Sequence, residues 1–225
     1  NLPRDESAPA ADLPPGSIEA VILDENRRPL PRTQVRLGIM FQKISEGESR
    51  SERFAMTDAA GRARFDGLST ASEYSYRVTV KRATAEYGSM PFNLGDKVGH
   101  RLSLHVFPMT NQLADAIVGV RGVVYVEPRD DVFQFEVMFR IINVGAVTWV
   151  PEDIVVKLPS GFKAFGAQKS MSGAGFEAVP DVGARLKGTF SPGQHDANFR
   201  FQMTKSADET ATFELDVLPR VVEFR

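Results

Sequence analysis

The sequence predicts an all-β protein made of two antiparallel β-sandwiches in tandem. The first observation is that apolar and polar residues alternate along several short segments, as in strands with one buried face. The second is that Gly, Pro, Asn and Asp cluster between these segments, while no long segment keeps a helical period. The third is the length of 225 residues. One sandwich of the immunoglobulin size needs only about 100 residues, so two sandwiches fit the chain.

The chain opens with a segment of low hydrophobicity. Residues 1–15 are rich in Pro and Ala and show no apolar periodicity. Such a segment buries too little side chain to offset the entropy lost on ordering. We therefore expect a flexible tether between a removed signal or an anchor and the first folded element.

The first half, residues 16–108, carries regular alternation. Apolar side chains alternate with polar or small ones over residues 34–42, and the same pattern recurs over residues 74–81. Each pattern predicts a strand with one buried face. Residues 16–23 and 102–106 are further predicted strands, the last before a break that contains Pro108.

The second half, residues 111–225, starts a new set of strands near Ile117. The best helical candidate in the chain, residues 110–117, is short and lies at this break. Each half has the size of a normal sandwich domain. Alternation recurs in three segments of the second half, which we predict to be strands: residues 133–141, 197–203 and 212–217.

The order of motifs in the first half is specific. A strand from Gly16 to Leu23 runs into a polar turn, and the motif Thr57-Asp-Ala-Ala-Gly-Arg-Ala-Arg-Phe-Asp-Gly-Leu68 precedes the strand 74–80. In these motifs residues 16–107 resemble the carboxypeptidase regulatory-like family, a small transthyretin-like (prealbumin-like) β-sandwich. Independently of that resemblance, Asp58 is expected to cap its turn, and Gly61 to take the positive φ of a tight hairpin.

The second half carries a different series of turn motifs. A strand ends in Asn143-Val-Gly145, the motif Leu158-Pro-Ser-Gly161 follows, and Pro192-Gly193 precedes another strand. Over residues 111–225 this order is similar to that of immunoglobulin-like domains of bacterial envelope and surface proteins. The resemblance implies scaffolding or adhesion rather than chemistry.

Charge and composition argue against several classes of function. Lys and Arg number 27 against 29 Asp and Glu, with no long block of one sign, so nucleic-acid binding is not expected. The absence of cysteine excludes disulfides, thiolate nucleophiles and thiolate metal sites. No segment has the roughly 18 apolar residues of a membrane span. We expect membrane attachment, if any, only through a segment outside this chain.

The histidines do not form a catalytic pattern. His100 and His105 lie in a predicted strand, and His195 lies in a predicted turn. No G-x-S-x-G motif and no short histidine spacing accompanies them. The aspartates of the predicted turns lack the dense oxygen ligands of a known calcium loop, so solvated turns are the favoured account over a calcium site. We therefore expect no catalysis, no cofactor and no bound metal.

Residues 159–176 form the most distinctive candidate binding segment, because they combine Gly and Ser with large apolar side chains. Long loops on a rigid sandwich often carry binding functions. The side chains that could contact a partner protein or a membrane are Phe162, Lys163, Phe165, Met171 and Phe176. The alternative is that the phenylalanines fold back over an open end of the sandwich, or that part of the segment is an unrecognised strand.

The only tryptophan, Trp149, lies beside Thr148 and Pro151. Its ring could stack on a sugar, as aromatic side chains of carbohydrate-binding modules do. Burial in the core is the favoured account, because a single tryptophan usually anchors packing.

Together these features predict a non-catalytic structural or interaction module of the bacterial cell envelope. We expect it in the periplasm or at the cell surface, where loops or strand edges would bind another envelope or surface protein. Two alternatives remain open. One is a carbohydrate-binding module for polysaccharide, and the other is an accessory region of a larger secreted hydrolase. All three functions rest on fold analogy.

Overall fold

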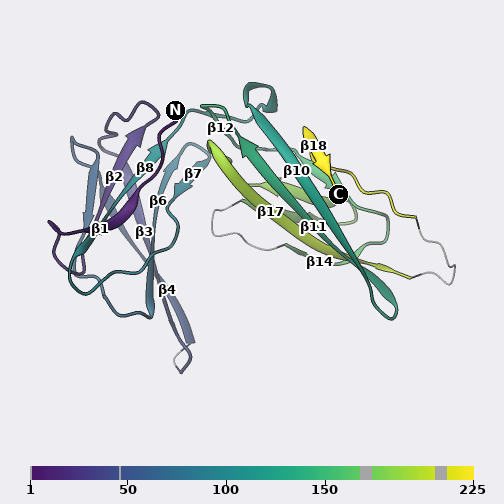
Figure 1. Ribbon diagram of the computed structural model, residues 1–225, viewed down its shortest axis with the longest axis horizontal. Helices are drawn as coiled ribbons and strands as arrows, with labels where there is room; N and C mark the ends of the chain where they lie inside the picture. The colour runs from purple at the N-terminus through teal and green to yellow at the C-terminus, as the bar shows by residue number, and fades with distance from the viewer. Residues whose placement is uncertain (1, 46, 168–173, 206–211) are drawn as a thin grey trace. The chain divides into compact units, whose positions relative to one another are not determined.

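The computed structural model describes residues 2–45, 47–167, 174–205 and 212–225 (Figure 1). In these residues the chain is mostly β-strand, and its helical part is a short 3-10 helix over Leu113–Asp115. The chain divides into two compact units, Asn1–Pro108 and Met109–Arg225. Each unit is a β-sandwich, so the predicted all-β fold class is confirmed.

The first unit packs two four-stranded sheets around one core. The strand order is β1-β8-β2-β5 in one sheet and β4-β3-β6-β7 in the other. Most neighbouring strands are antiparallel, but β2 and β8 run parallel. The strands are β1 (Ser7–Ala10), β2 (Ile18–Asp24), β3 (Gln34–Lys43), β4 (Gly47–Met56), β5 (Arg62–Phe65), β6 (Tyr74–Arg82), β7 (Ala85–Gly88) and β8 (Gly99–Val106).

The N-terminal segment is part of this unit. β1 pairs with β8 along the edge of the sheet. The carboxylate of Asp5 accepts a hydrogen bond from the backbone N–H of His105 and lies 2.9 Å from its ring Nδ1. Asp12 forms an ion pair with Arg101 at 2.6 Å. The prediction of a flexible tether over residues 1–15 was therefore wrong, because composition measures apolar content and misses backbone pairing and polar contacts.

The second unit has a five-stranded sheet of order β14-β17-β11-β10-β18, a three-stranded sheet of order β13-β16-β15 and a short pair, β12 with β9. Two pairs, β10 with β18 and β12 with β9, are parallel. Its core is rich in phenylalanine. The strands are β9 (Met109–Thr110), β10 (Val118–Pro128), β11 (Val132–Asn143), β12 (Thr148–Trp149), β13 (Val155–Lys157), β14 (Lys163–Ala167), β15 (Gly175–Val179), β16 (Gly183–Lys187), β17 (Gly193–Thr204) and β18 (Val221–Phe224).

One predicted strand of the second unit is absent. Residues 212–218 have no regular secondary structure, although Phe213 and Leu215 pack partly against the core. Alternation reports which side chains face inward, whereas a strand also needs a neighbouring backbone for pairing. The prediction of a strand over residues 212–217 was therefore wrong.

Candidate binding surfaces

The predicted binding segment, residues 159–176, is not an exposed apolar loop. It contains β14 and the start of β15. Phe176 is buried, and its ring lies 4.8 Å from that of Phe199 in the core. Phe162 and Phe165 are half-buried and pack against the same core. Lys163 is exposed, and Met171 lies outside the described residues. The prediction of a patch of exposed phenylalanines was therefore wrong, and the alternative of folded-back side chains and an unrecognised strand holds.

Trp149 is also a core residue. Its side chain is 2% exposed, and its ring lies 5.5 Å from that of Phe190. A buried indole cannot offer a face to a sugar, so the possibility of glycan stacking at Trp149 was wrong and the favoured account, burial in the core, is confirmed.

The histidines have separate structural contacts. His100 Nε2 lies 2.8 Å from the hydroxyl oxygen of Ser7, and His195 Nε2 lies 2.7 Å from the backbone carbonyl oxygen of Ser191. Burial lowers the pKa of both imidazoles. Among the residues that the structure describes, no group of three or more His, Cys, Asp or Glu side chains could hold a metal ion.

The turn aspartates cap their own turns. An Oδ1 atom of Asp58 accepts hydrogen bonds from the backbone N–H groups of Ala60 and Arg62, at 2.8 and 2.9 Å. Between these residues Gly61 has a φ of 72°, as the hairpin requires. Asp24 makes the same type of turn further upstream. These carboxylates shape the loops of the first unit.

The outer edge of β4 is the most extensive free strand edge of the first unit. β4 ends its sheet and pairs on one side with β3 over ten residues without a shift in register. Nine of its ten residues are exposed and the other is half-buried. Figure 1 shows this hairpin extending past the other strands of its unit. The edge is open to solvent over most of its length, and near its C-terminal end the Arg53 guanidinium donates a hydrogen bond to the backbone carbonyl oxygen of Asp66, just beyond β5.

Hydrogen bonding across the hairpin identifies which backbone groups of β4 are unpaired. Just beyond β4, the N–H of Thr57 donates to the carbonyl of Thr33 on the side of β3. Along an antiparallel pair, successive residues point their N–H and C=O groups to opposite sides. In the continuous register of this hairpin, odd-numbered β4 residues bond to β3. The even-numbered residues therefore direct their backbone groups outward: Glu48, Arg50, Glu52, Phe54 and Met56.

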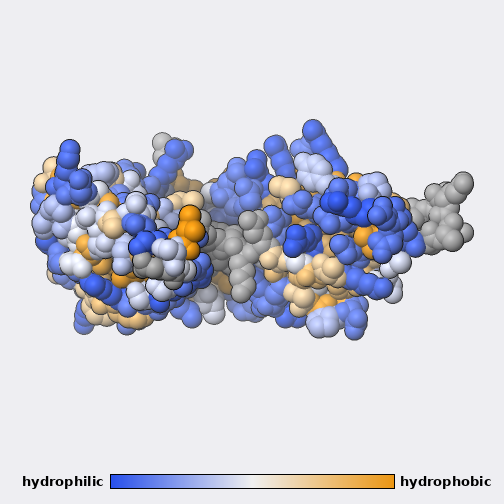
Figure 2. Space-filling model, turned by 90° about the horizontal axis from the view of Figure 1, so that it is seen from below, coloured by the Kyte–Doolittle hydropathy of each residue, from blue (hydrophilic) through white to orange (hydrophobic). Residues whose placement is uncertain are grey.

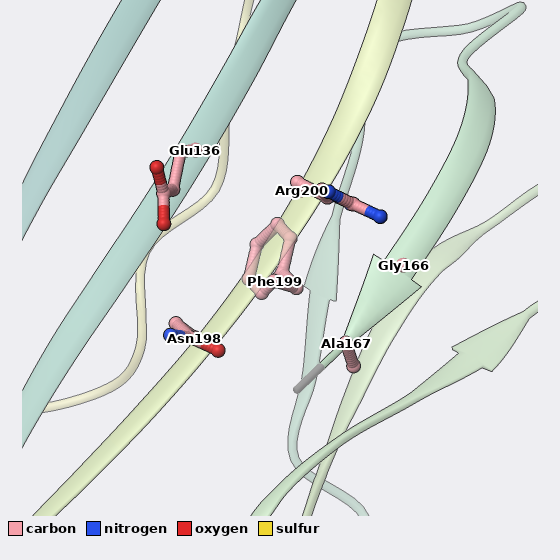
Figure 3. Close-up of a pocket in the computed structure, with 6 residues that line it drawn as sticks. All are labelled: Glu136, Gly166, Ala167, Asn198, Phe199 and Arg200. Atoms are coloured by element: carbon pink, nitrogen blue, oxygen red, sulfur yellow. The ribbon is translucent and has the colours of Figure 1, made fainter. Parts of the chain in front are cut away.

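A groove of about 290 Å³ lies on the five-stranded sheet of the second unit (Figure 3). Glu136 of β11 and Arg200 of β17 lie directly opposite each other in the strand register. Among the described residues neither charged group has a hydrogen bond or an ion pair. On the same face, Arg140 and Asp196 do form an ion pair, at 3.0 Å. The complete lining is Glu136, Gly166, Ala167, Asn198, Phe199 and Arg200.

The face of the molecule seen in Figure 2 is mostly polar. Figure 2 shows hydrophilic residues over much of the visible face, with apolar residues in small groups among them. In the part of the chain that the structure describes, no helix has the length and apolar character of a membrane span.

No protein-family model and no curated protein sequence matches the chain. Among solved structures, the full-length major pilin SpaD from Corynebacterium diphtheriae is similar at 12% sequence identity and a TM-score of 0.30. The match covers 84% of this chain and 56% of the pilin chain, so this chain spans little more than half of that protein. A likeness at this level identifies neither a family nor a function.

Proposed function

We propose that this chain is a non-catalytic structural and interaction module of the bacterial cell envelope, in the periplasm or at the cell surface. It binds a partner protein through the edge of β4. The observation that carries the proposal is the free, exposed edge of this ten-residue strand. Unpaired N–H and C=O groups along a strand edge accept an extended segment of another chain by β-strand addition.

β4 lacks most of the devices that keep strand edges from associating. Proteins commonly use a very short edge strand, a proline, a bulge or a covering segment. β4 is long, contains no proline and has no shift in register. Its charged side chains are of both signs, Glu48, Arg50, Glu52 and Arg53. Charges of both signs favour partners with a complementary pattern over indiscriminate association.

The proposed location outside the cytoplasm is supported by the resemblance of residues 111–225 to immunoglobulin-like domains of bacterial envelope and surface proteins. We expect a tagged full-length protein in its native cells to be digested when protease is added to cells with an opened outer layer. Protection under conditions that leave a cytoplasmic marker intact would contradict this location.

The β4 edge can be tested with two substitutions at one position. Glu52→Pro removes an outward N–H, whereas Glu52→Thr removes the same charge and keeps the N–H. With a photo-cross-linking residue at position 50 in native cells, we expect Glu52→Pro to lower the yield of β4 adducts about fivefold, the equivalent of roughly one hydrogen bond. Glu52→Thr should retain most of the yield.

The same cross-linking residue at Arg121, an exposed position on β10, is the control for chance encounters. If positions 50 and 121 give the same products, or if Glu52→Pro and Glu52→Thr behave alike, β4 is not the docking edge.

Carbohydrate binding is a second candidate function, and the groove on the five-stranded sheet favours it. On three neighbouring strands of this sheet, exposed Tyr125 of β10 lies opposite Glu136 of β11, and Glu136 lies opposite Arg200 of β17. A carboxylate accepts hydrogen bonds from sugar hydroxyls, a guanidinium donates to them, and a tyrosine ring packs on the apolar face of a sugar. The groove offers the carboxylate and the guanidinium, and Tyr125 of the neighbouring strand β10 lies outside its lining and provides the ring, so the sheet presents the three kinds of contact that a neutral sugar chain uses.

Calorimetric titration with dextran, mannan and laminarin tests this second candidate. If one of them binds, we expect Arg200→Ala to weaken its affinity about tenfold, because a hydrogen bond to a charged group contributes about 1.5–3 kcal/mol. Arg140→Ala, on the same face but outside the groove, should leave the affinity unchanged. If none of the three polysaccharides gives a heat of binding, or if both variants lose the same affinity, the groove is not the sugar site.

A further inference from the structure

The charges along the β4 edge form a pattern that is complementary to itself. The outward-directed residues, Glu48, Arg50, Glu52, Phe54 and Met56, have their side chains on one face of the sheet. When two antiparallel edges join, residues with outward backbone groups must face one another to exchange hydrogen bonds. The register between two β4 strands can therefore change only in steps that keep even-numbered residues opposite even-numbered residues.

Charge and paired length together select one of these registers, because a twofold axis at Ser49, which also sets Arg50 opposite an acid (Glu48 of the partner subunit), pairs only residues 47–51 of β4. If residues 48–54 of two copies pair with each other, Ser51 faces Ser51 of the partner subunit, and Arg50 faces Glu52 of the partner subunit. The twofold axis repeats this ion pair, and the pairs add to those within each chain, Arg50 with Glu48 at 2.6 Å and Glu52 with Arg36 at 3.3 Å. Shifting the register by one step in one direction sets Arg50 opposite Arg50 of the partner subunit. Shifting it by one step in the other direction sets Glu52 opposite Glu52 of the partner subunit. Like charges directly opposite each other destabilise strand pairing, whereas opposite charges stabilise it.

We propose that the partner strand on β4 is β4 of a second copy of this chain, paired antiparallel about a twofold axis at Ser51. The two sheets of order β4-β3-β6-β7 then form one continuous sheet with a closed, isologous interface. This inference rests on the proposed function, because it names the partner of the same edge.

The interface is small. Edge pairing over residues 48–54 buries far less than the roughly 1,600 Å² of a standard protein interface. The dimer is accordingly weak and dependent on concentration, and it gains from the high local concentration of an envelope or surface array.

A cysteine scan reads the register directly, because the chain contains no cysteine of its own. Ser51 and Ser51 of the partner subunit form a pair without mutual backbone hydrogen bonds, with Cα atoms about 4.5 Å apart. That distance is within the range of a disulfide. With copper phenanthroline as the oxidant, we expect Ser51→Cys to give a covalent dimer. Ser49→Cys and Glu52→Cys, which face Arg53 and Arg50 of the partner subunit, should stay monomeric.

Charge reversal provides an independent test. In a dimer of the Arg50→Glu variant, two acidic side chains face each other at each of the two former ion pairs. In a dimer of the Glu52→Arg variant, two arginines face each other at both of these places. We expect sedimentation equilibrium to show about a tenfold weaker dimer for each variant. An equimolar mixture of the two variants restores both ion pairs, so mixed dimers should form with at least the affinity of the unmodified chain.

The outcomes separate this inference from the proposed function. A covalent dimer from Glu52→Cys but not from Ser51→Cys overturns the register, and a chain that is monomeric at every concentration overturns the homodimer. If the chain is monomeric, β4 can still form adducts with a different protein. If those adducts require the N–H of residue 52, the proposed function is supported although the homodimer is not. If β4 gives neither a dimer nor such adducts, both proposals fail.

Discussion

Replacing Phe199 by alanine is expected to lower the free energy of unfolding of the second unit by about 3–5 kcal/mol. Phe199 lies on β17 and is 1% exposed. Its ring centroid lies 4.8 Å from that of Phe176 on β15 and 5.8 Å from that of Phe165 on β14. Removing it leaves a cavity where rings from both sheets meet, and the surrounding strands cannot collapse to fill it.

The measurement uses the buried tryptophan of the same unit. Trp149 is the only tryptophan of the chain, so its fluorescence in a denaturant titration reports the second unit separately from the first. Phe224→Ala is the matched control, because Phe224 is 37% exposed on β18 and should lose only about 1 kcal/mol. If the two substitutions shift the midpoint equally, the phenylalanine cluster is not the centre of the core.

The strands that could be predicted from sequence are those with one buried face. β3, β6, β11 and β17 alternate because every second side chain enters a core, and all four were recognisable from that alternation. β4 carries no such pattern, because all but one of its residues are exposed. It is a strand because β3 provides a partner backbone, and this could not be read from its own residues.

The candidate surfaces were harder to predict for the same reason. Residues 159–176 look like an exposed apolar loop in sequence, but the strands β14 and β15 direct their phenylalanines into the core. Glu136 and Arg200 become neighbours only through the pairing of β11 with β17. The charges of β4 can be recognised as self-complementary only when the direction of its backbone groups is known, because that direction limits which residues can face each other. A sequence supplies the side chains, and the register of neighbouring strands determines which of them meet.

Deleting residues 1–13 is expected to destabilise the first unit by on the order of 4 kcal/mol, although their composition is that of a linker. The deletion removes Ser7, whose hydroxyl lies within hydrogen-bond distance of buried His100, and Asp5, whose carboxylate contacts buried His105. An unpaired buried polar group costs about 1–3 kcal/mol. The deletion also leaves one edge of β8 without its antiparallel partner. Arg101 keeps its ion pair with Glu19 at 2.6 Å, so the remaining sheet retains that contact.

The titration of His100 distinguishes a packed segment from a loose one. Burial lowers the pKa of this imidazole in the folded chain, so its contribution to stability is present above the ordinary pKa of about 6.5 and is lost as the pH falls. Without residues 1–13 the ring meets water, and its pKa should return toward the ordinary value. Proton NMR titration of the full and shortened chains measures this shift. A shortened chain with the same His100 pKa and the same unfolding midpoint would show that the segment is only a tether, because solvent access to His100 and β8 would then not depend on it.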